Sequence, residues 1–232
     1  MNSNALVRST VTSLPHHSKN RARDFRFHPF SNHLENAIDR LCGLALLIAL
    51  SPLMAYVAWR IWREDGAPVL FAHWRVGKQG RLFRCYKFRS MLRNSEEVLA
   101  RLLTEDPQAR AEWERDQKLR NDPRITRIGH FLRKTSLDEL PQLLNVVKGE
   151  MSLVGPRPIT LQELKRYGPA KPHYLAVKPG MTGLWQVSGR NNTTYDRRVE
   201  LDRHYVESRC ALLNAWILFK TVLVVVTRDG AC

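Results

Sequence analysis

The segment from Leu41 to Trp59 has the sequence LCGLALLIALSPLMAYVAW, 19 positions without a charged residue. As an α-helix it would extend about 28 Å, close to the roughly 30 Å hydrocarbon core of a lipid bilayer. A helix buried in the core of a soluble domain would have the same composition, so that alternative stays open. The segment favours a membrane anchor that separates a polar region before it from a charged, mixed region after it.

Pro52, which follows Ser51, lies near the middle of this segment. A proline has no backbone N–H and its ring clashes with the carbonyl four residues earlier, here that of Ile48, so a bend is expected. The Ser51 hydroxyl is a candidate partner for a backbone group that the bend frees. A helix that enters the bilayer and returns, broken at Ser51 and Pro52, and a kinked helix that spans it are both compatible with this pattern.

The charges beside the segment bear on the same choice. Spanning helices usually carry positive charge mainly on their cytoplasmic side. Here basic residues flank both ends, namely Arg23, Arg26 and Arg40 before the segment and Arg60, Arg63, Arg75 and Lys78 after it. If both ends favour the cytoplasmic face, the helix must enter and return.

The composition limits the class of partner. The 232 residues are 44% apolar, enough for one domain of ordinary size or one domain with an anchor. Lys and Arg number 37 against 22 Asp and Glu, a formal charge of +15, so the partner should be anionic: nucleic acid, anionic lipid or a phosphorylated substrate. The four cysteines form no CxxC pair, which argues against a disulfide framework or a zinc site.

The chain divides into three parts. Residues 1–33 are polar and rich in Arg, Ser and His, and we expect a disordered tail. Residues 34–64 contain the membrane helix, and residues 65–232 form the remaining domain. There, two β-like runs meet at Gly77–Gly80 and predict a hairpin. Helical patterns follow at 94–119, interrupted near Asp106 and Pro107, and at 138–147, 160–167, 194–208 and 211–227. The last of these could lie in the membrane interface or pack as a core helix.

The sharpest chemical feature is TSLDELPQ, residues 135–142, with adjacent carboxylates at Asp138 and Glu139. Helix capping explains them in two ways: Ser136 and Glu139 fit a capping box, and Asp138 fits an N-cap with Pro141 in the first turn. The functional alternative makes Asp138 a nucleophile that attacks phosphorus, with a bound cation offsetting the repulsion between the two anions. Glu139 would then tune or orient Asp138 or act as a base.

Three further motifs carry groups suited to phosphates or nucleotides. GPRP, residues 155–158, fixes Arg157 between prolines for bidentate phosphate binding, or is a rigid surface loop. YKFRSM, residues 86–91, places Lys87 and Arg89 on one face of a strand, to bind phosphate or simply to face water. KPGMTGLWQVSGR, residues 178–190, is a nucleotide-sugar loop or a structural turn over a buried tryptophan.

Together with the apolar segment, these motifs occur in the order found in the monotopic phosphoglycosyl transferases, which the chain closely resembles from about Leu34 to its C-terminus. These are the bacterial sugar transferases that initiate exopolysaccharide, capsule and O-antigen synthesis. The resemblance implies a mainly helical α/β fold with a re-entrant helix broken at Ser51 and Pro52. A small cytosolic catalytic domain with a β-hairpin and interfacial amphipathic helices would lie at the cytoplasmic face of the bacterial inner membrane.

The resemblance also implies a reaction. Asp138 would attack the β-phosphorus of a UDP-sugar, release UMP and hold the sugar phosphate, which polyprenyl phosphate would then accept; Mg²⁺ is expected at Asp138. Arg157 would bind a substrate phosphate, with Lys87, Arg89 and Arg133 as helpers. The nucleotide-sugar loop would contain Lys178, Gly180, Gly183, Trp185 and Arg190.

Several properties stay open. The chain differs from longer family members in having only a polar tail where they carry several membrane spans, so we expect the compact catalytic unit. The alternative function is a membrane-anchored basic binding or scaffold protein without catalysis. A nucleic-acid partner is not expected, because no recognised nucleic-acid module is present. The sequence does not specify the transferred sugar, and it leaves a homodimer among the options.

Overall fold

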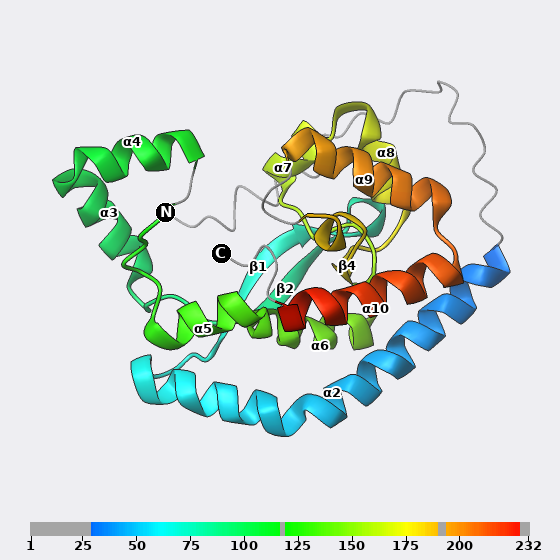
Figure 1. The fold of residues 1–232 in the computed structure, drawn as a ribbon, viewed down its shortest axis with the longest axis horizontal. Coiled ribbons are helices and arrows are strands. Elements are labelled where there is room, and N and C mark those ends of the chain that lie inside the picture. The colour runs from blue at the N-terminus through cyan, green and yellow to red at the C-terminus, as the bar shows by residue number, and fades with distance from the viewer. Residues whose placement is uncertain (1–28, 117–118, 190–193, 228–232) are drawn as a thin grey trace. The chain divides into compact units, whose positions relative to one another are not determined.

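A computed structural model describes residues 29–116, 119–189 and 194–227. Its longest helix, α2, extends from Pro29 to Asp65 and contains the whole apolar segment. Among the described residues it is the one helix that is long and apolar enough to cross a membrane. The helix begins inside the stretch expected as a polar tail, and residues 1–28 of that stretch lie outside the described part. Figure 1 shows α2 running below the other labelled elements.

The predicted bend in α2 is present, and the helix continues through it. Pro52 lies inside α2, and Figure 1 shows the helix turning between its two halves. The Ser51 hydroxyl donates a hydrogen bond of 2.8 Å to the Ile48 carbonyl, the acceptor for which Pro52 has no N–H. Ser51 therefore supplies the partner that the sequence suggested, and the chain bends without leaving the helical conformation.

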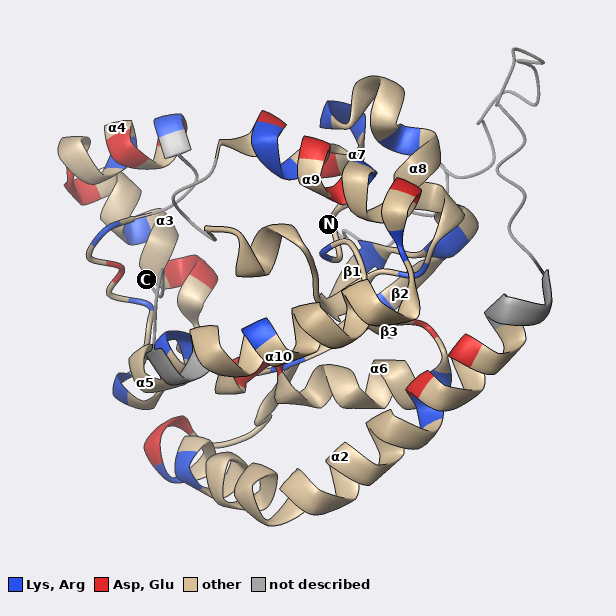
Figure 2. Cartoon of the chain, turned by 45° about the vertical axis from the view of Figure 1, so that its right-hand side comes forward, with Lys and Arg blue, Asp and Glu red and all other residues tan. Residues whose placement is uncertain are grey.

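Both ends of α2 are attached to the same domain. Near the start, the Ser152 hydroxyl donates to Asp39 at 2.6 Å; at the end, the Arg127 N–H donates to Glu64 at 2.7 Å. Between these attachments the apolar surface is open, with Leu41 67% and Ile48 65% exposed. Figure 2 shows charged residues at both ends of α2 and none through its middle.

The predicted hairpin follows α2. Strands β1, Leu70–Val76, and β2, Leu82–Phe88, pair antiparallel with Leu70 opposite Phe88. The 3₁₀ turn η1, Lys78–Gly80, joins them, with Gln79 and Gly80 at positive φ. The glycine at position 80 suits this left-handed backbone, because it has no Cβ to clash.

The next segment leaves the domain and returns to the same place. Helices α3, Ser95–Glu105, and α4, Pro107–Asp116, form it and are separated where the sequence predicted an interruption. At its base Met91 pairs with Ile125, and the Leu92 N–H donates to the Arg124 carbonyl at 2.8 Å. The chain thus re-enters beside its point of exit, and Figure 1 shows α3 and α4 extending away from the sheets.

Three short helices carry the paired carboxylates: α5, Arg127–Thr135, the 3₁₀ helix η2, Leu137–Gln142, and α6, Leu143–Lys148. Ser136 is the N-cap residue of η2, but neither predicted capping interaction forms. Ser136 has a left-handed backbone with φ of 58° and makes no side-chain cap hydrogen bond, while Asp138 lies inside η2 rather than before a helix. Because α5 ends at this left-handed residue, the chain turns sharply and presents both carboxylates on a new helix.

The remaining elements are a second small sheet and its covering helices. Strands β3, Ser152–Val154, and β4, Gly180–Thr182, pair in parallel. Between them lie α7, Leu161–Arg166, η3, Gly168–Ala170, and α8, Lys171–Ala176; after β4 come η4, Trp185–Val187, α9, Tyr195–Ser208, and α10, Ala211–Thr227.

Helix α10 combines the two alternatives left open for it. Ile217 is fully buried in a cluster with Val154 and Tyr205, so one face packs against the domain. Leu212 and Phe219 are exposed, and the Lys220 ammonium lies over the Trp216 ring at 5.8 Å. The inner face is therefore part of the core, and the outer face is apolar with one cation.

Candidate active site

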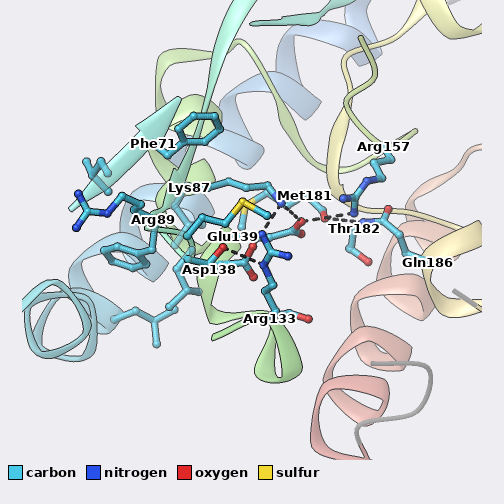
Figure 3. Close-up of a pocket in the computed structure, with 18 of the residues that line it drawn as sticks. Phe71, Lys87, Arg89, Arg133, Asp138, Glu139, Arg157, Met181, Thr182 and Gln186 are labelled. Atoms are coloured by element: carbon cyan, nitrogen blue, oxygen red, sulfur yellow. Dashed lines mark hydrogen bonds and ion pairs between the residues drawn. The ribbon is translucent and has the colours of Figure 1, made fainter. Parts of the chain in front are cut away.

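The carboxylate pair lies in a cavity of about 1100 Å³. Its polar part contains Asp138, Glu139, Lys87 and Arg157, which come from η2, β2 and the GPRP loop and point toward one another in Figure 3. Its apolar part includes side chains of α2 and α10, among them Leu46, Leu50, Leu218 and Val224. A charged site and an apolar wall therefore share one cavity.

Lys87 contacts both carboxylates. Its ammonium lies 2.6 Å from Glu139 Oε1 and 3.4 Å from Asp138 Oδ2. Arg157 Nη1 lies 3.4 Å from the same Glu139 oxygen. Glu139 is thus paired with two cations, whereas Asp138 has the longer contact to Lys87. This difference leaves Asp138 the less neutralised carboxylate of the pair.

Burial is the main influence on Asp138, and it raises the pKa of this carboxyl above its usual value. Lys87 opposes the rise, Glu139 adds to it as a neighbouring anion, and Arg133 opposes it more weakly. A carboxylate with a raised pKa is more basic than an exposed one, and a more basic oxygen is a better nucleophile. The environment therefore suits Asp138 to attack an electrophile.

The structure brings together three of the four predicted phosphate-binding cations. Lys87, Arg133 and Arg157 surround the pair, and Arg133 is held by a hydrogen bond of 2.9 Å from its Nε to the Ser90 hydroxyl. Arg89 lines the same cavity, but its Nη2 donates to the Asp65 and Gly66 carbonyls at 3.0 and 2.8 Å. Arg89 therefore fastens the end of α2 to β2 instead of reaching the carboxylates.

Asn145 attaches α6 to β2 beside Lys87, and no sequence motif pointed to it. This α6 residue is 0% exposed. Its side-chain oxygen accepts from the Tyr86 N–H at 3.1 Å and its nitrogen donates to the Arg84 carbonyl at 2.7 Å. One amide thus occupies the open edge of β2 as a neighbouring strand would, one residue before Lys87.

The predicted nucleotide-sugar loop divides into parts with different roles. Trp185 lines the cavity, whereas Lys178 does not, and Arg190 lies outside the described residues. Gly180 and Gly183 do not serve as positive-φ turns. A Cβ on either one would overlap backbone atoms of Gly155, so these glycines let the loop pack directly against GPRP.

Two cavity residues from this loop were not predicted. Thr182 and Gln186 lie beside Arg157 in Figure 3 and line the cavity. The Gln186 amide nitrogen donates to the Met181 carbonyl at 3.0 Å. Both residues belong to the quoted motif, so their position in it was the available signal. They add uncharged polar groups to a site otherwise made of ions.

A second buried carboxyl, Asp202 of α9, lies behind this loop and is 2% exposed. It accepts a hydrogen bond of 2.7 Å from the Tyr167 hydroxyl. Burial raises its pKa to about 7, although the hydrogen bond and the cations Arg198 and Arg157 oppose the rise. Asp202 therefore joins α9 to Tyr167 and has a pKa near neutral pH.

The described residues include no group of three metal-ligating side chains. Magnesium in nucleotide sites is, however, commonly held by one or two carboxylates together with substrate phosphates and water. Asp138 and Glu139 provide carboxylates of that kind at the cavity. The donor set fits a magnesium ion that binds together with a phosphorylated substrate.

Comparison with known proteins agrees with this geometry. Residues 30–228 match the family model described as bacterial sugar transferase. The chain is 58% identical over 201 residues to an undecaprenyl-phosphate galactose phosphotransferase of Salmonella typhimurium and 55% identical over 201 residues to a UDP-galactose-lipid carrier transferase of Erwinia amylovora, matching 87% of this chain and 42% of each relative. It is 44% identical over 203 residues to the exopolysaccharide production protein ExoY of Sinorhizobium fredii, covering 88% of this chain and 90% of that protein.

Asp202 predicts a pH-dependent stability difference. Its pKa is higher in the folded protein, about 7, than the ordinary 3.8, so its stabilising contribution is complete below pH 3.8 and is lost as the pH rises through about 7. We expect the free energy of unfolding of the wild type to fall relative to that of Asp202→Asn between pH 4 and 7, by at most about 1.4 kcal/mol per pH unit, because asparagine cannot ionise. Thermal unfolding of both proteins in detergent measures this difference, and a constant difference across the range would contradict the assignment.

Proposed function

The chain belongs to the bacterial sugar transferase family, and from this premise we propose that it transfers a hexose 1-phosphate from a UDP-sugar to a polyprenyl phosphate. The observation that carries the proposal is the pair of buried Asp138 and partly buried Glu139, contacted by Lys87 in a cavity with an apolar wall. Because this chain spans only 42% of the two galactose-related proteins, their activity is a hypothesis for it. Their names make UDP-galactose the first donor to test.

In the first half-reaction, Asp138 attacks the β-phosphorus of the donor. A bond forms between the carboxylate oxygen and phosphorus, and the bond from phosphorus to the bridging oxygen breaks, so that UMP leaves with the bonding electrons. Arg157 and Arg133 are placed to balance the charge on the phosphates. Glu139, paired with Lys87 and Arg157, keeps these cations beside the reacting carboxylate.

In the second half-reaction, an oxygen of the polyprenyl phosphate attacks the same phosphorus. The acyl phosphate bond breaks, Asp138 is restored as a carboxylate, and the product is a sugar linked to the lipid by a diphosphate. The apolar wall formed by Leu46, Leu50 and Leu218 supports this role, since it gives an isoprenoid chain a route to the charged groups. A bound Mg²⁺ would supply charge neutralisation for the diphosphate at Asp138 and Glu139.

We further propose that α2 is re-entrant and places the domain at the cytoplasmic face of the inner membrane. The support is the attachment of both helix ends to one domain, through Asp39 and Ser152 at one end and Glu64 and Arg127 at the other. A helix whose ends lay on opposite sides of a bilayer could not make both contacts. The exposed apolar middle between them would then lie in lipid.

The first experiment uses UDP-galactose labelled at the β-phosphate, with full-length protein in detergent and Mg²⁺. Without acceptor, we expect a stoichiometric burst of UMP and label retained on the protein; undecaprenyl phosphate should then discharge the label into lipid. Asp138→Asn should show neither the UMP burst nor the label on the protein. Glu139→Gln should still be labelled at Asp138. If no UDP-sugar yields UMP with folded protein, the chain is a membrane-anchored binding or scaffold protein.

Removal of Lys87 should shift the pH dependence of the reaction. Lys87 lowers the pKa of Asp138, so Lys87→Gln should raise that pKa, and the acidic limb of the rate profile should move to higher pH because the nucleophile must be ionised. Initial rates of UMP release across the pH range measure the shift. Lys134→Gln removes an exposed charge from α5 and serves as the control. An unchanged limb, or one displaced to lower pH, would contradict the assigned role.

The topology of α2 can be measured with cysteine labelling. Cys42, Cys85, Cys210 and Cys232 are first replaced by alanine, and a single cysteine is introduced at Ala37 or at Arg63, one near each end of α2. A membrane-impermeant maleimide should label both positions in inside-out vesicles and neither in intact spheroplasts. Labelling of the two positions from opposite sides would establish a spanning helix instead.

A further inference from the structure

Two partly buried lysines lie outside the cavity. Lys78 begins η1, and Lys178 precedes β4. Neither ammonium makes a hydrogen bond or an ion pair with any residue in the described ranges. Burial lowers the pKa of both, and nearby cations lower it further: Arg209 for Lys78, and Arg40 and Lys78 for Lys178. The fold thus holds cations together here at an electrostatic cost.

The acids in the same region do not balance this charge. We call Arg40, Lys78, Lys178 and Arg209 the basic cluster. The acids near it are Glu35 and Asp39. Asp39 accepts from the Ser152 hydroxyl at 2.6 Å and from the Leu153 N–H at 3.4 Å. Glu35 lies 3.9 Å from Arg209. Asp39 is thus hydrogen-bonded to β3, and Glu35 pairs with Arg209 inside the cluster. Four cations face two acids, and positive charge remains at the two lysines.

The position of the cluster identifies the kind of anion. Arg40 belongs to the first half of α2, and Arg209 and Lys178 lie near Glu35 and Asp39 of the same half. There, Leu34, Ile38 and Leu41 are exposed apolar side chains. None of the four cations lines the cavity that contains Asp138. A ligand that bears a negative charge and an apolar chain matches this combination, and the site is separate from the one assigned to the reaction.

We propose that the basic cluster binds the phosphate of an anionic phospholipid headgroup, with an acyl chain lying along Leu34, Ile38 and Leu41. Lysine ammonium groups bind phosphate oxygens as point charges. Basic side chains near a membrane surface favour anionic lipid by roughly 1 kcal/mol each. A lipid held here would neutralise Lys78 and Lys178 and fix the first half of α2 against the domain at the level of the headgroups.

The test titrates phosphatidylglycerol into the full-length protein in neutral detergent and follows Tm, with phosphatidylcholine as the reference lipid. We expect phosphatidylglycerol to raise Tm. In Lys78→Gln/Lys178→Gln, the lipid concentration that gives half of this rise should increase by about tenfold or more, since two cations are lost. Lys134→Gln/Lys165→Gln removes two exposed lysines elsewhere and should bind like the wild type. If the double variant does not fold, Lys78→Gln alone should show a smaller loss of the same sign.

Two results would overturn the proposal. One is an equal response of wild type and Lys78→Gln/Lys178→Gln to phosphatidylglycerol. The other is an equal stabilisation by glycerol phosphate, which has the same anionic group without acyl chains and would indicate a soluble phosphate ligand. The readout is lipid binding and needs no turnover, so its failure is distinguishable from a failure of the proposed transferase activity.

Discussion

The repulsion between the adjacent carboxylates of Asp138 and Glu139 is the constraint around which the domain is arranged. A buried anion beside a partly buried one is unfavourable unless cations approach them, and three separate parts of the chain each supply one. Lys87 comes from the hairpin, Arg133 from α5 and Arg157 from the GPRP loop. Asn145 joins the hairpin to the carboxylate segment, and Gly180 and Gly183 let their loop pack closely against GPRP.

Local signals predicted much of this arrangement. The apolar segment, the proline bend with its serine partner, the hairpin and the interruption between α3 and α4 follow from periodicity, from proline chemistry and from glycine turns. Only the resemblance to a known family predicted that Lys87, Arg133 and Arg157 meet near Asp138, because no local pattern shows which distant segments are in contact. The capping predictions for Ser136 and Asp138 failed because a left-handed residue at the end of α5 restarted the chain as a 3₁₀ helix.

Other details depend on tertiary contacts that the sequence does not encode locally. Arg89 was predicted to share a face with Lys87, but it follows the end of β2 and its guanidinium donates to the carbonyls at the end of α2. Gly180 and Gly183 suggested turns, but their role is to let two backbones approach. Asn145 is one polar residue in an apolar stretch, and only its burial between α6 and the edge of β2 shows its importance.

The segment that carries α3 and α4 is closed at its base by Met91 opposite Ile125 and by the Leu92 to Arg124 hydrogen bond. Because its ends meet, changing its length alters mainly the entropy of closing a loop, which grows only slowly with the number of residues. Lys87 lies before this closure and Arg133 after it. Evolution can therefore lengthen, shorten or exchange this appendage while Lys87 and Arg133 keep their spacing, which makes it the natural place for diversification within the fold.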